Sequence, residues 1–329
     1  MLTKRQNFLE TIHGGKPDRF VNQYEYMSML LGTHPVGNKF PGPQPGTETV
    51  NGWGITNRWG AGQPGSFPVH DDEHRVLKDI TKWKDVVKAP SLDFPDSAWE
   101  GAVKAAEAVD RNETFATAFV APGLFEQSHH LQGMIQCLEN FYEEPEAMKD
   151  LIAYLTDYEL RYAADICSHL KVDAIFHHDD WGSHTSSFLS PDMFEEFFLD
   201  AYKKIYGYYK QHGVEIIVHH CDSYAANLVP AMIEMGIDVF QGCVTTNDVP
   251  ALVKKYGGKI SFMGDLDNGV MDREDWTPEL IKKEVERACR TNGKLYFIPC
   301  LTHGLSFSTY PGVYEKTSEE IDRMSKELF

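Results

Sequence analysis

Short apolar segments alternate with helical segments through the last two thirds of this sequence, and this alternation restricts the fold more than any other feature. The apolar segments cover residues 114–120, 172–176, 214–218, 237–240, 259–263 and 294–298. Helical periodicity covers 98–109, 126–141, 146–169, 191–211, 223–235, 248–256, 277–291 and 311–328. Strands that alternate with helices form parallel sheets, and strands buried on both faces read as continuous apolar runs. We therefore expect an α/β protein built on a parallel sheet.

Chemically reactive residues gather where these apolar segments end. They are His177-His178-Asp179-Asp180, His219-His220-Cys221-Asp222, Gln241-Gly242-Cys243, Gly264-Asp265-Leu266-Asp267, and Cys300 with His303. In a (β/α)₈ barrel the carboxyl ends of the strands form the active-site face. A chain of 329 residues is long enough for one such barrel. We expect a single (β/α)₈ TIM-barrel domain over residues 1–329, with its site at that face.

The first 95 residues lack this regularity and are rich in Gly, Pro and Trp, most clearly over 41–70. Ordered loops of this length often cover an active site. We therefore expect a loop-rich N-terminal part that covers the active-site face, with Trp53 and Trp59 packed against the rest of the protein. The first residues read as a short amphipathic helix and lack the apolar core of a signal peptide.

Charge and cysteine content exclude several classes of function. The chain has 31 Lys and Arg against 49 Asp and Glu, a net charge of −18, which argues against general binding of nucleic acid or anionic membranes. The apolar runs are far too short to span a bilayer. With no signal peptide we expect a cytoplasmic protein whose six cysteines stay reduced and serve metal binding, catalysis or packing.

One spacing suggests a metal site. His219 and Cys221 are two residues apart and would point the same way from an extended strand, and Cys300 ends a later strand. Zinc takes imidazole and thiolate ligands, and a catalytic zinc keeps one position open. The alternative is that both thiols only fill space in the core. Cys243 is either a fourth ligand or a packing residue near the site.

The sequence contains two pairs of adjacent histidines at predicted strand ends, and it does not say directly which member of each pair faces the barrel centre. Only one member of His177-His178, and one of His219-His220, can point to the barrel centre, because successive side chains of a strand alternate. Cys221 favours His219 by parity. The choice between His177 and His178 stays open, and His177 is the member named as a catalytic candidate.

The motifs resemble those of a known family. The matching residues are Lys16-Pro17-Asp18-Arg19, Trp53-Gly54, Asp179-Asp180-Trp181-Gly182, Ser190-Pro191, Phe194, His219-x-Cys221, Gly264-Asp265-Leu266-Asp267 and Cys300. They are similar to the uroporphyrinogen decarboxylase superfamily, and within it to the zinc- and corrinoid-dependent methyltransferases. The resemblance implies a (β/α)₈ barrel with zinc on His219, Cys221 and Cys300.

The sequence departs from the motifs of two branches of this superfamily, which argues against the activities of those branches. Thiol-alkylating members often carry a Glu ligand on the next strand, and residues 239–244 contain none. The decarboxylases hold substrate carboxylates with an Arg-rich motif, and residues 21–27 contain no Arg. The chain looks more like the methyltransferase components of aryl methyl ether O-demethylases.

The resemblance implies transfer of a methyl group from a methoxyarene of the guaiacol, veratrole or vanillate type to a Co(I) corrinoid. Zinc would act as Lewis acid on the ether oxygen. No corrinoid-binding module is visible, so the corrinoid is expected on a partner protein, in an anaerobic cytoplasm. A homodimer is compatible with the sequence. The alternatives are methylation of a thiol such as coenzyme M or homocysteine, decarboxylation of a porphyrinogen, and a non-catalytic binding barrel.

Roles for individual side chains follow from residue type. The candidates for a proton or hydrogen-bond donor at the leaving oxygen are His177, Asp179, Asp180 and His303. Aromatic residues that could clamp a planar ring are Tyr24, Tyr26, Trp53 and Trp181. Gln241, Asp265 and Asp267 are candidates for contacts to the substrate or around the metal. The structural alternatives are that one of the Asp179-Asp180 pair caps a loop while the other orients a ligand, and that the remaining residues serve loops and packing.

Overall fold

A curled parallel sheet forms the centre of the computed structural model, which describes residues 1–63 and 65–329. Its strands are β1 (Met27–Leu30), β5 (Phe115–Val120), β6 (Ala174–His178), β7 (Ile216–His220), β8 (Val239–Cys243), β9 (Ser261–Leu266) and β10 (Phe297–Leu301). They are hydrogen-bonded in this order, and every neighbouring pair is parallel. A small antiparallel sheet contains β2 (Glu48–Val50), β3 (Thr56–Arg58) and β4 (Phe67–Pro68). The predicted α/β fold with a parallel, TIM-barrel-like sheet is confirmed.

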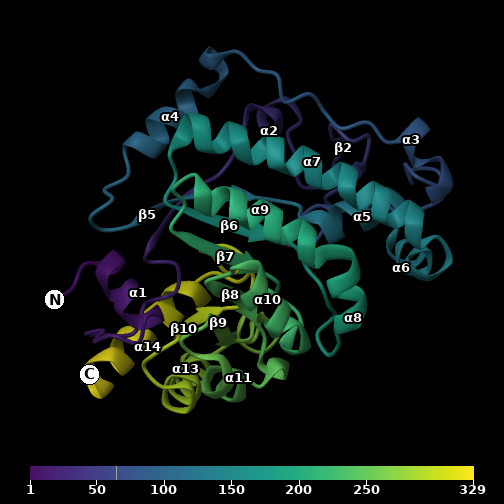
Figure 1. Ribbon diagram of the computed structural model, residues 1–329. Helices are drawn as coiled ribbons and strands as arrows, with labels where there is room; N and C mark the ends of the chain where they lie inside the picture. The colour runs from purple at the N-terminus through teal and green to yellow at the C-terminus, as the bar shows by residue number, and fades with distance from the viewer. Residues whose placement is uncertain (64) are drawn as a thin grey trace.

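Helices surround the large sheet (Figure 1). They are α1 (Lys4–Ile12), α2 (Pro35–Lys39), α3 (Trp83–Val86), α4 (Glu100–Glu107), α5 (Leu124–Gln132), α6 (Met134–Glu143), α7 (Pro145–Leu170), α8 (Pro191–Phe194), α9 (Asp200–Gln211), α10 (Val229–Met235), α11 (Val249–Tyr256), α12 (Asn268–Met271), α13 (Pro278–Asn292) and α14 (Val313–Leu328). A π-helical turn (Glu195–Leu199) joins α8 to α9. No helix in the described ranges is both long and apolar enough to cross a membrane.

The interior of the curled sheet is a single apolar cluster to which all seven strands contribute. Its members are Phe8, Ile12, Val21, Tyr24, Tyr26, Met27, Phe115, Ala174, Phe176, Ile216, Val218, Val239, Met263, Ile298 and Cys300. A second and larger cluster fills the space between the strands and the outer helices. Because β1 and β10 share the interior cluster, the sheet curls until its two edges face each other, as a barrel requires.

The described strands number seven in this sheet, and a side chain bridges its two edges. Gln23 accepts a hydrogen bond from the backbone of Leu301 at 3.3 Å and donates one to the carbonyl of Tyr314 at 3.2 Å. Gln23 has a φ of 51°, which turns the chain so that its side chain reaches across. The amide thus partly supplies the pairing that a further strand would provide.

Five of the six predicted strands, all except β5, begin and end two to three residues later than the apolar runs indicate. The run 172–176 becomes Ala174–His178, and the run 214–218 becomes Ile216–His220. His177 pairs with His219 and His178 with His220 in the parallel ladder between β6 and β7. The histidines expected directly after the apolar runs are therefore the last residues of the strands, where side chains alternate strictly between the two faces.

The N-terminal part has more structure than its composition suggests. It contains β1, which the sequence did not predict, and α1, whose Phe8 and Ile12 pack into the barrel interior. The stretch from Leu77 to Ala89 lies over α5 and α7: the backbone amide of Leu77 donates to the carbonyl of Leu131, and the amide of Ala89 donates to the hydroxyl of Tyr154. The predicted helix 126–141 is two helices, because Gly133 adopts a φ of 81° between α5 and α6.

Candidate metal centre at the barrel mouth

The two histidine pairs each send one ring inward and one outward. His178 and His220 point into the barrel, where their ring centroids are 4.4 Å apart and the ring of His220 stacks on the interior Phe176. His177 and His219 point outward into the helix layer. The parity predicted for His219 is therefore wrong, and in the pair left open it is His178 and not the candidate His177 that points inward. Phe176 and Val218 fill the barrel interior, which fixes His178 and His220 on the same face.

Three side chains at the mouth form a group that can hold a metal ion. One ligating atom each from His178, Asp180 and His220 lies within 4.8 Å of the others. The Nε2 atom of His220 is 3.8 Å from the Oδ1 atom of Asp180. Two imidazoles and a carboxylate are a donor set that zinc accepts, and ferrous iron uses the same combination. His220 is buried whereas Asp180 is about a third exposed, so the group opens to the mouth on one side.

Neighbouring groups fix the orientation of both imidazoles. The Nδ1 atom of His178 is 2.9 Å from a carboxylate oxygen of Glu126, the third residue of α5. The Nδ1 atom of His220 donates to the amide oxygen of Gln241. Such bonds set the tautomer of a metal-ligating histidine and leave Nε2 free for the metal. The arrangement fits a bound divalent cation.

Acidic groups outnumber basic ones at this mouth. Burial raises the pKa of Glu126 to about 7, and Asp180 and Asp179 add to the shift while His178 opposes it. Burial and the nearby Asp180 hold the pKa of Asp222 well above its usual range. Burial lowers the pKa of His178, but Glu126 and Asp180 outweigh it and raise that pKa to about 10. An excess of negative charge in a partly buried site favours a cation.

His177 and His219 belong to a closed network outside the barrel. The Nε2 atom of His177 lies 2.5 Å from Glu159 of α7, and its Nδ1 atom lies 3.2 Å from the hydroxyl of Tyr206. That hydroxyl also lies 2.9 Å from the Nδ1 atom of His219. The ring of Trp181 stacks on His219 with centroids 3.9 Å apart. These two imidazoles tie the strands to α7 and α9 and do not reach the mouth.

Asp179 anchors the start of α5. Its carboxylate accepts hydrogen bonds from the backbone amides of Phe125 at 3.1 Å and Glu126 at 2.7 Å, from the indole of Trp181 at 2.8 Å, and from the hydroxyl of Tyr202. Residue 123 must be glycine for this approach, since a Cβ there would lie 2.5 Å from the Cβ of Asp179. Of the predicted pair, Asp179 caps a helix and Asp180 joins the metal-binding group.

The three predicted zinc ligands do not come together. Cys221 lies in the outer cluster, where its sulfur contacts the backbone amide of Trp181 at 3.3 Å and the hydroxyl of Ser223 at 2.8 Å. Cys300 lies in the interior cluster, on the other side of the strand layer. Burial raises the pKa of both thiols. Cys243 also lies in the outer cluster.

Several other predicted residues serve structure. Tyr26 stacks on Phe8 of α1 at 3.8 Å, deep in the interior. The hydroxyl of Tyr24 donates to the carbonyl of His303 at 2.7 Å. Asp265 is buried against Arg287 at 2.9 Å, and burial raises its pKa although the guanidinium opposes the shift.

The remaining predicted residues divide between the mouth and a separate cavity. Gln241 contacts His220, as described, and so belongs to the mouth. Asp267 lies 3.8 Å from the imidazole of His184 and caps α12 through the amide of Gly269. Gly304, which follows His303, lies against the ring of His220, since a Cβ at residue 304 would come within 3.0 Å of that ring, so His303 also lies near the mouth. Trp53 lines a separate cavity beside α7.

Four residues at the mouth were missed or passed over by the sequence reasoning: His178, His220, Glu126 and Asp222. The available signal was the spacing His178-x-Asp180 at the end of one strand together with His220 at the matching position on the next strand. Glu126 carries no comparable signal, because it reaches the site only through the placement of α5.

Comparison with known proteins places this site in a family. Residues 72–324 match the uroporphyrinogen decarboxylase (URO-D) family. Curated proteins give no significant match. Among solved structures, a methyltransferase from Methanosarcina mazei is similar, with a TM-score of 0.68 and 13% identity over 98% of this chain and 99% of that one.

A B12-independent methionine synthase from Shewanella sp. W3-18-1 has a TM-score of 0.48 and 12% identity over 74% of this chain and 68% of that chain. Identities this low establish only a shared fold, and the lower TM-score supports no further comparison. The match over residues 72–324 covers most of the chain, with both metal-site histidines inside it. The protein therefore belongs to the uroporphyrinogen decarboxylase family.

Proposed function

We propose that the protein is a methyltransferase that takes the methyl group of an uncharged aromatic methyl ether and passes it to a Co(I) corrinoid on a partner protein. The observation that carries this proposal is the His178–Asp180–His220 group in an acidic barrel mouth. The family and the motif resemblance support methyl transfer, and the chemistry of the mouth supports a neutral substrate.

The charges at the mouth disfavour the decarboxylase alternative. Glu126, Asp180 and Asp267 have histidines as their ion-pair partners, and in the described ranges none of them is paired with Lys or Arg. Asp222 adds a further carboxyl group. A porphyrinogen carries several carboxylates, which this field would repel. A methoxyarene without acidic substituents pays no such electrostatic cost.

The donor set at the mouth fits zinc, which we propose is held by His178, Asp180 and His220. When bound there, zinc supplies Lewis-acid stabilisation of the negative charge that develops on the ether oxygen. Glu126 and Gln241 keep the two imidazoles in place through their Nδ1 atoms. Fixed donors of this kind avoid reorganisation during the reaction.

The reaction also needs a proton for the leaving phenolate oxygen. The ether C–O bond breaks, the methyl carbon bonds to cobalt, which goes formally from Co(I) to Co(III), and the phenolate oxygen takes up one proton. We assign this proton transfer to His303, whose Nε2 atom has no hydrogen-bond partner in the described structure and lies 3.8 Å from Asp272. His177 and Asp179, two other candidates, face the helix layer and are committed to structural bonds.

Metal content tests the site independently of turnover. We expect about one zinc per chain in the wild type, lost from His178→Ala and His220→Ala and kept in Cys221→Ser and Cys300→Ser. The cysteine variants are matched controls because the resemblance places the ligands there. Zinc lost from the cysteine variants and kept in the histidine variants would overturn the assignment of the ligands.

Turnover tests the reaction. Anaerobic incubation of the zinc-loaded protein with free cob(I)alamin and guaiacol or veratrole should give methylcobalamin and the phenol in equal amounts, followed by the corrinoid absorbance. Coenzyme M with methylcobalamin, and uroporphyrinogen, test the alternatives. Turnover of either alternative substrate, with none of the methoxyarenes, would refute the proposed function.

The partner is tested separately. We expect the protein to bind a methyl-accepting corrinoid protein weakly and in a manner that depends on the cobalt oxidation state. Zinc content and turnover with free cob(I)alamin do not need the partner. A failure to bind in either oxidation state would therefore refute the proposed partner without affecting the proposed metal site.

A further inference from the structure

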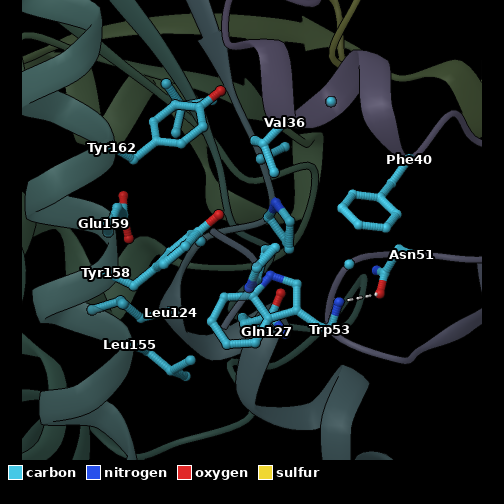
Figure 2. Close-up of a pocket in the computed structure, with 17 residues that line it drawn as sticks. Val36, Phe40, Asn51, Trp53, Leu124, Gln127, Leu155, Tyr158, Glu159 and Tyr162 are labelled. Carbon is cyan, nitrogen blue, oxygen red and sulfur yellow. Dashed lines mark hydrogen bonds between the residues drawn. The ribbon is translucent and has the colours of Figure 1, made fainter. Parts of the chain in front are cut away.

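A second cavity lies between α5, α7 and the segment from α2 to Trp53. Its volume is about 200 Å³. Figure 2 shows Tyr158, Glu159 and Tyr162 of α7 on one side and Phe40 on the other. None of the three metal-binding side chains at the mouth lines it. We call it the α5–α7 cavity.

Aromatic rings dominate the walls of the α5–α7 cavity. Phe40, Trp53, Tyr158 and Tyr162 all line it. The rings of Trp53 and Tyr158 meet edge to face, with centroids 4.8 Å apart and an interplanar angle of 71°. Rings in such pairs accept a further ring in an offset or edge-on position. Drug-sized ligands occupy roughly 300–1,000 Å³, so this smaller cavity suits a molecule of one ring.

One polar side chain in the wall lacks a partner. Gln127 is only 5% exposed, and its side-chain nitrogen has no hydrogen-bond partner in the described structure. Gln127 also lines the cavity. A buried donor without an acceptor is costly, and such groups usually mark a missing ligand or water. An oxygen acceptor placed in the cavity would satisfy this amide.

The charges around the cavity select against anions. Glu159 is the only carboxylate among the described lining residues, and none of those residues is Lys, Arg or His. One oxygen of Glu159 already contacts His177 of the outer network. An anionic ligand would therefore lose its hydration beside a carboxylate, and no positively charged side chain in the described lining would compensate it, which is unfavourable.

From these observations we infer that the α5–α7 cavity is a second binding site, for an uncharged molecule of one aromatic ring that carries an oxygen acceptor. The ring packs against Trp53 and Tyr158, and the oxygen accepts from the side-chain amide of Gln127. This inference goes beyond the proposed function, because it requires neither zinc nor a corrinoid.

Calorimetric titration with two probes of equal size tests the inference. Acetophenone is neutral and has a ketone oxygen, whereas benzoate has the same shape and a negative charge. Acetophenone has no ether methyl group and so cannot be a methyl donor in the proposed reaction. We expect acetophenone to bind at up to millimolar concentration and benzoate not to bind. The absence of acetophenone binding, or equal binding of benzoate, would overturn the inference.

Variants locate the binding site. Gln127→Leu keeps the side-chain volume and removes the amide, so we expect acetophenone binding to weaken about fivefold to tenfold while stability is kept or raised. Trp53→Ala should weaken it at least as much. Trp59→Ala, six residues after Trp53 and not among the residues that line the cavity, and His220→Ala, at the mouth, are the controls. Binding that is lost in His220→Ala and unchanged in Gln127→Leu would move the site to the mouth and contradict the inference.

Discussion

Replacing Asp179 by asparagine should destabilise the protein although the shape of the side chain is unchanged. One carboxylate oxygen accepts from the backbone of Glu126, and the other accepts from the backbone of Phe125 and the indole of Trp181. These three groups can only donate. Whichever way an asparagine amide turns, its NH₂ group faces at least one N–H donor.

The expected cost follows from those contacts. A hydrogen bond to a charged group is worth about 1.5–3 kcal/mol, and a buried donor left without an acceptor loses it in full. Burial raises the pKa of Asp179, so the neutral amide regains part of the cost of burying a charge. We therefore expect Asp179→Asn to lower the free energy of unfolding by about 2 kcal/mol, a large share of a typical 5–15 kcal/mol.

Urea denaturation of Asp179→Asn beside Asp180→Asn measures this effect. Asp180 is partly exposed and accepts one hydrogen bond from the backbone of Asp222 at 3.0 Å, which an asparagine oxygen can still accept. The control should change stability by no more than about 0.5 kcal/mol. Equal unfolding midpoints for the two variants would refute the anchoring role. Because Asp179 holds the turn that carries Glu126, the variant should also bind zinc about tenfold more weakly.

Three further predictions use other parts of the molecule. Burial lowers the pKa of His129 to about 4, below the value of about 6.5 in the unfolded chain. The unfolded chain therefore takes up a proton first as the pH drops, and the stability of the folded protein falls. Urea unfolding should show that His129→Gln loses about 2 kcal/mol less stability than the wild type between about pH 7 and about pH 5. Tyr206→Phe leaves two buried imidazoles without a shared hydroxyl and should lower the free energy of unfolding by about 1–3 kcal/mol, measured by thermal or urea unfolding. Tyr209→Phe, on the same helix, removes a buried hydroxyl that has no hydrogen-bond partner among the described residues and should cost nothing. Zinc at about a hundred times its dissociation constant should add about 2.7 kcal/mol to the stability of the wild type and none to His220→Ala, as measured by urea titration with and without the metal.

The alternation of apolar and helical segments was enough to predict the architecture. Six of the seven strands of the large sheet were predicted near their final positions, because strands buried on both faces must be apolar throughout. β1 was missed, since Met27–Leu30 is short and lies in a stretch rich in Gly and Pro with no clear period. Its place depends on pairing with β5, which is a tertiary contact and leaves no local signal.

The predicted site and the His178–Asp180–His220 group both lie at the carboxyl ends of the strands, but the prediction named His177 and His219, whose side chains point to the opposite face of their strands. The period of a strand is two, so an error of one residue exchanges every inward side chain for an outward one. Both faces of β6 and β7 are buried, so hydrophobicity does not say which of two adjacent histidines points inward. Cys221 served as the guide to parity, but it lies beyond the end of β7 and packs in the outer cluster.

The paired histidines show why residue type alone could not assign the ligands. At each strand end one imidazole lies beside an acidic residue of the mouth, and the neighbouring imidazole lies beside the hydroxyl of Tyr206 in α9. Both environments suit a histidine, the first through the proposed metal and the second through hydrogen bonds to buried partners. The two rings therefore matter in different ways. We expect loss of the inward ring to abolish metal binding with little effect on the stability of the metal-free protein, and loss of the outward ring to lower the stability. Measuring zinc content and unfolding free energy on the same set of alanine variants separates the two, and a variant of an outward histidine that folds normally without zinc would reverse the assignment of faces.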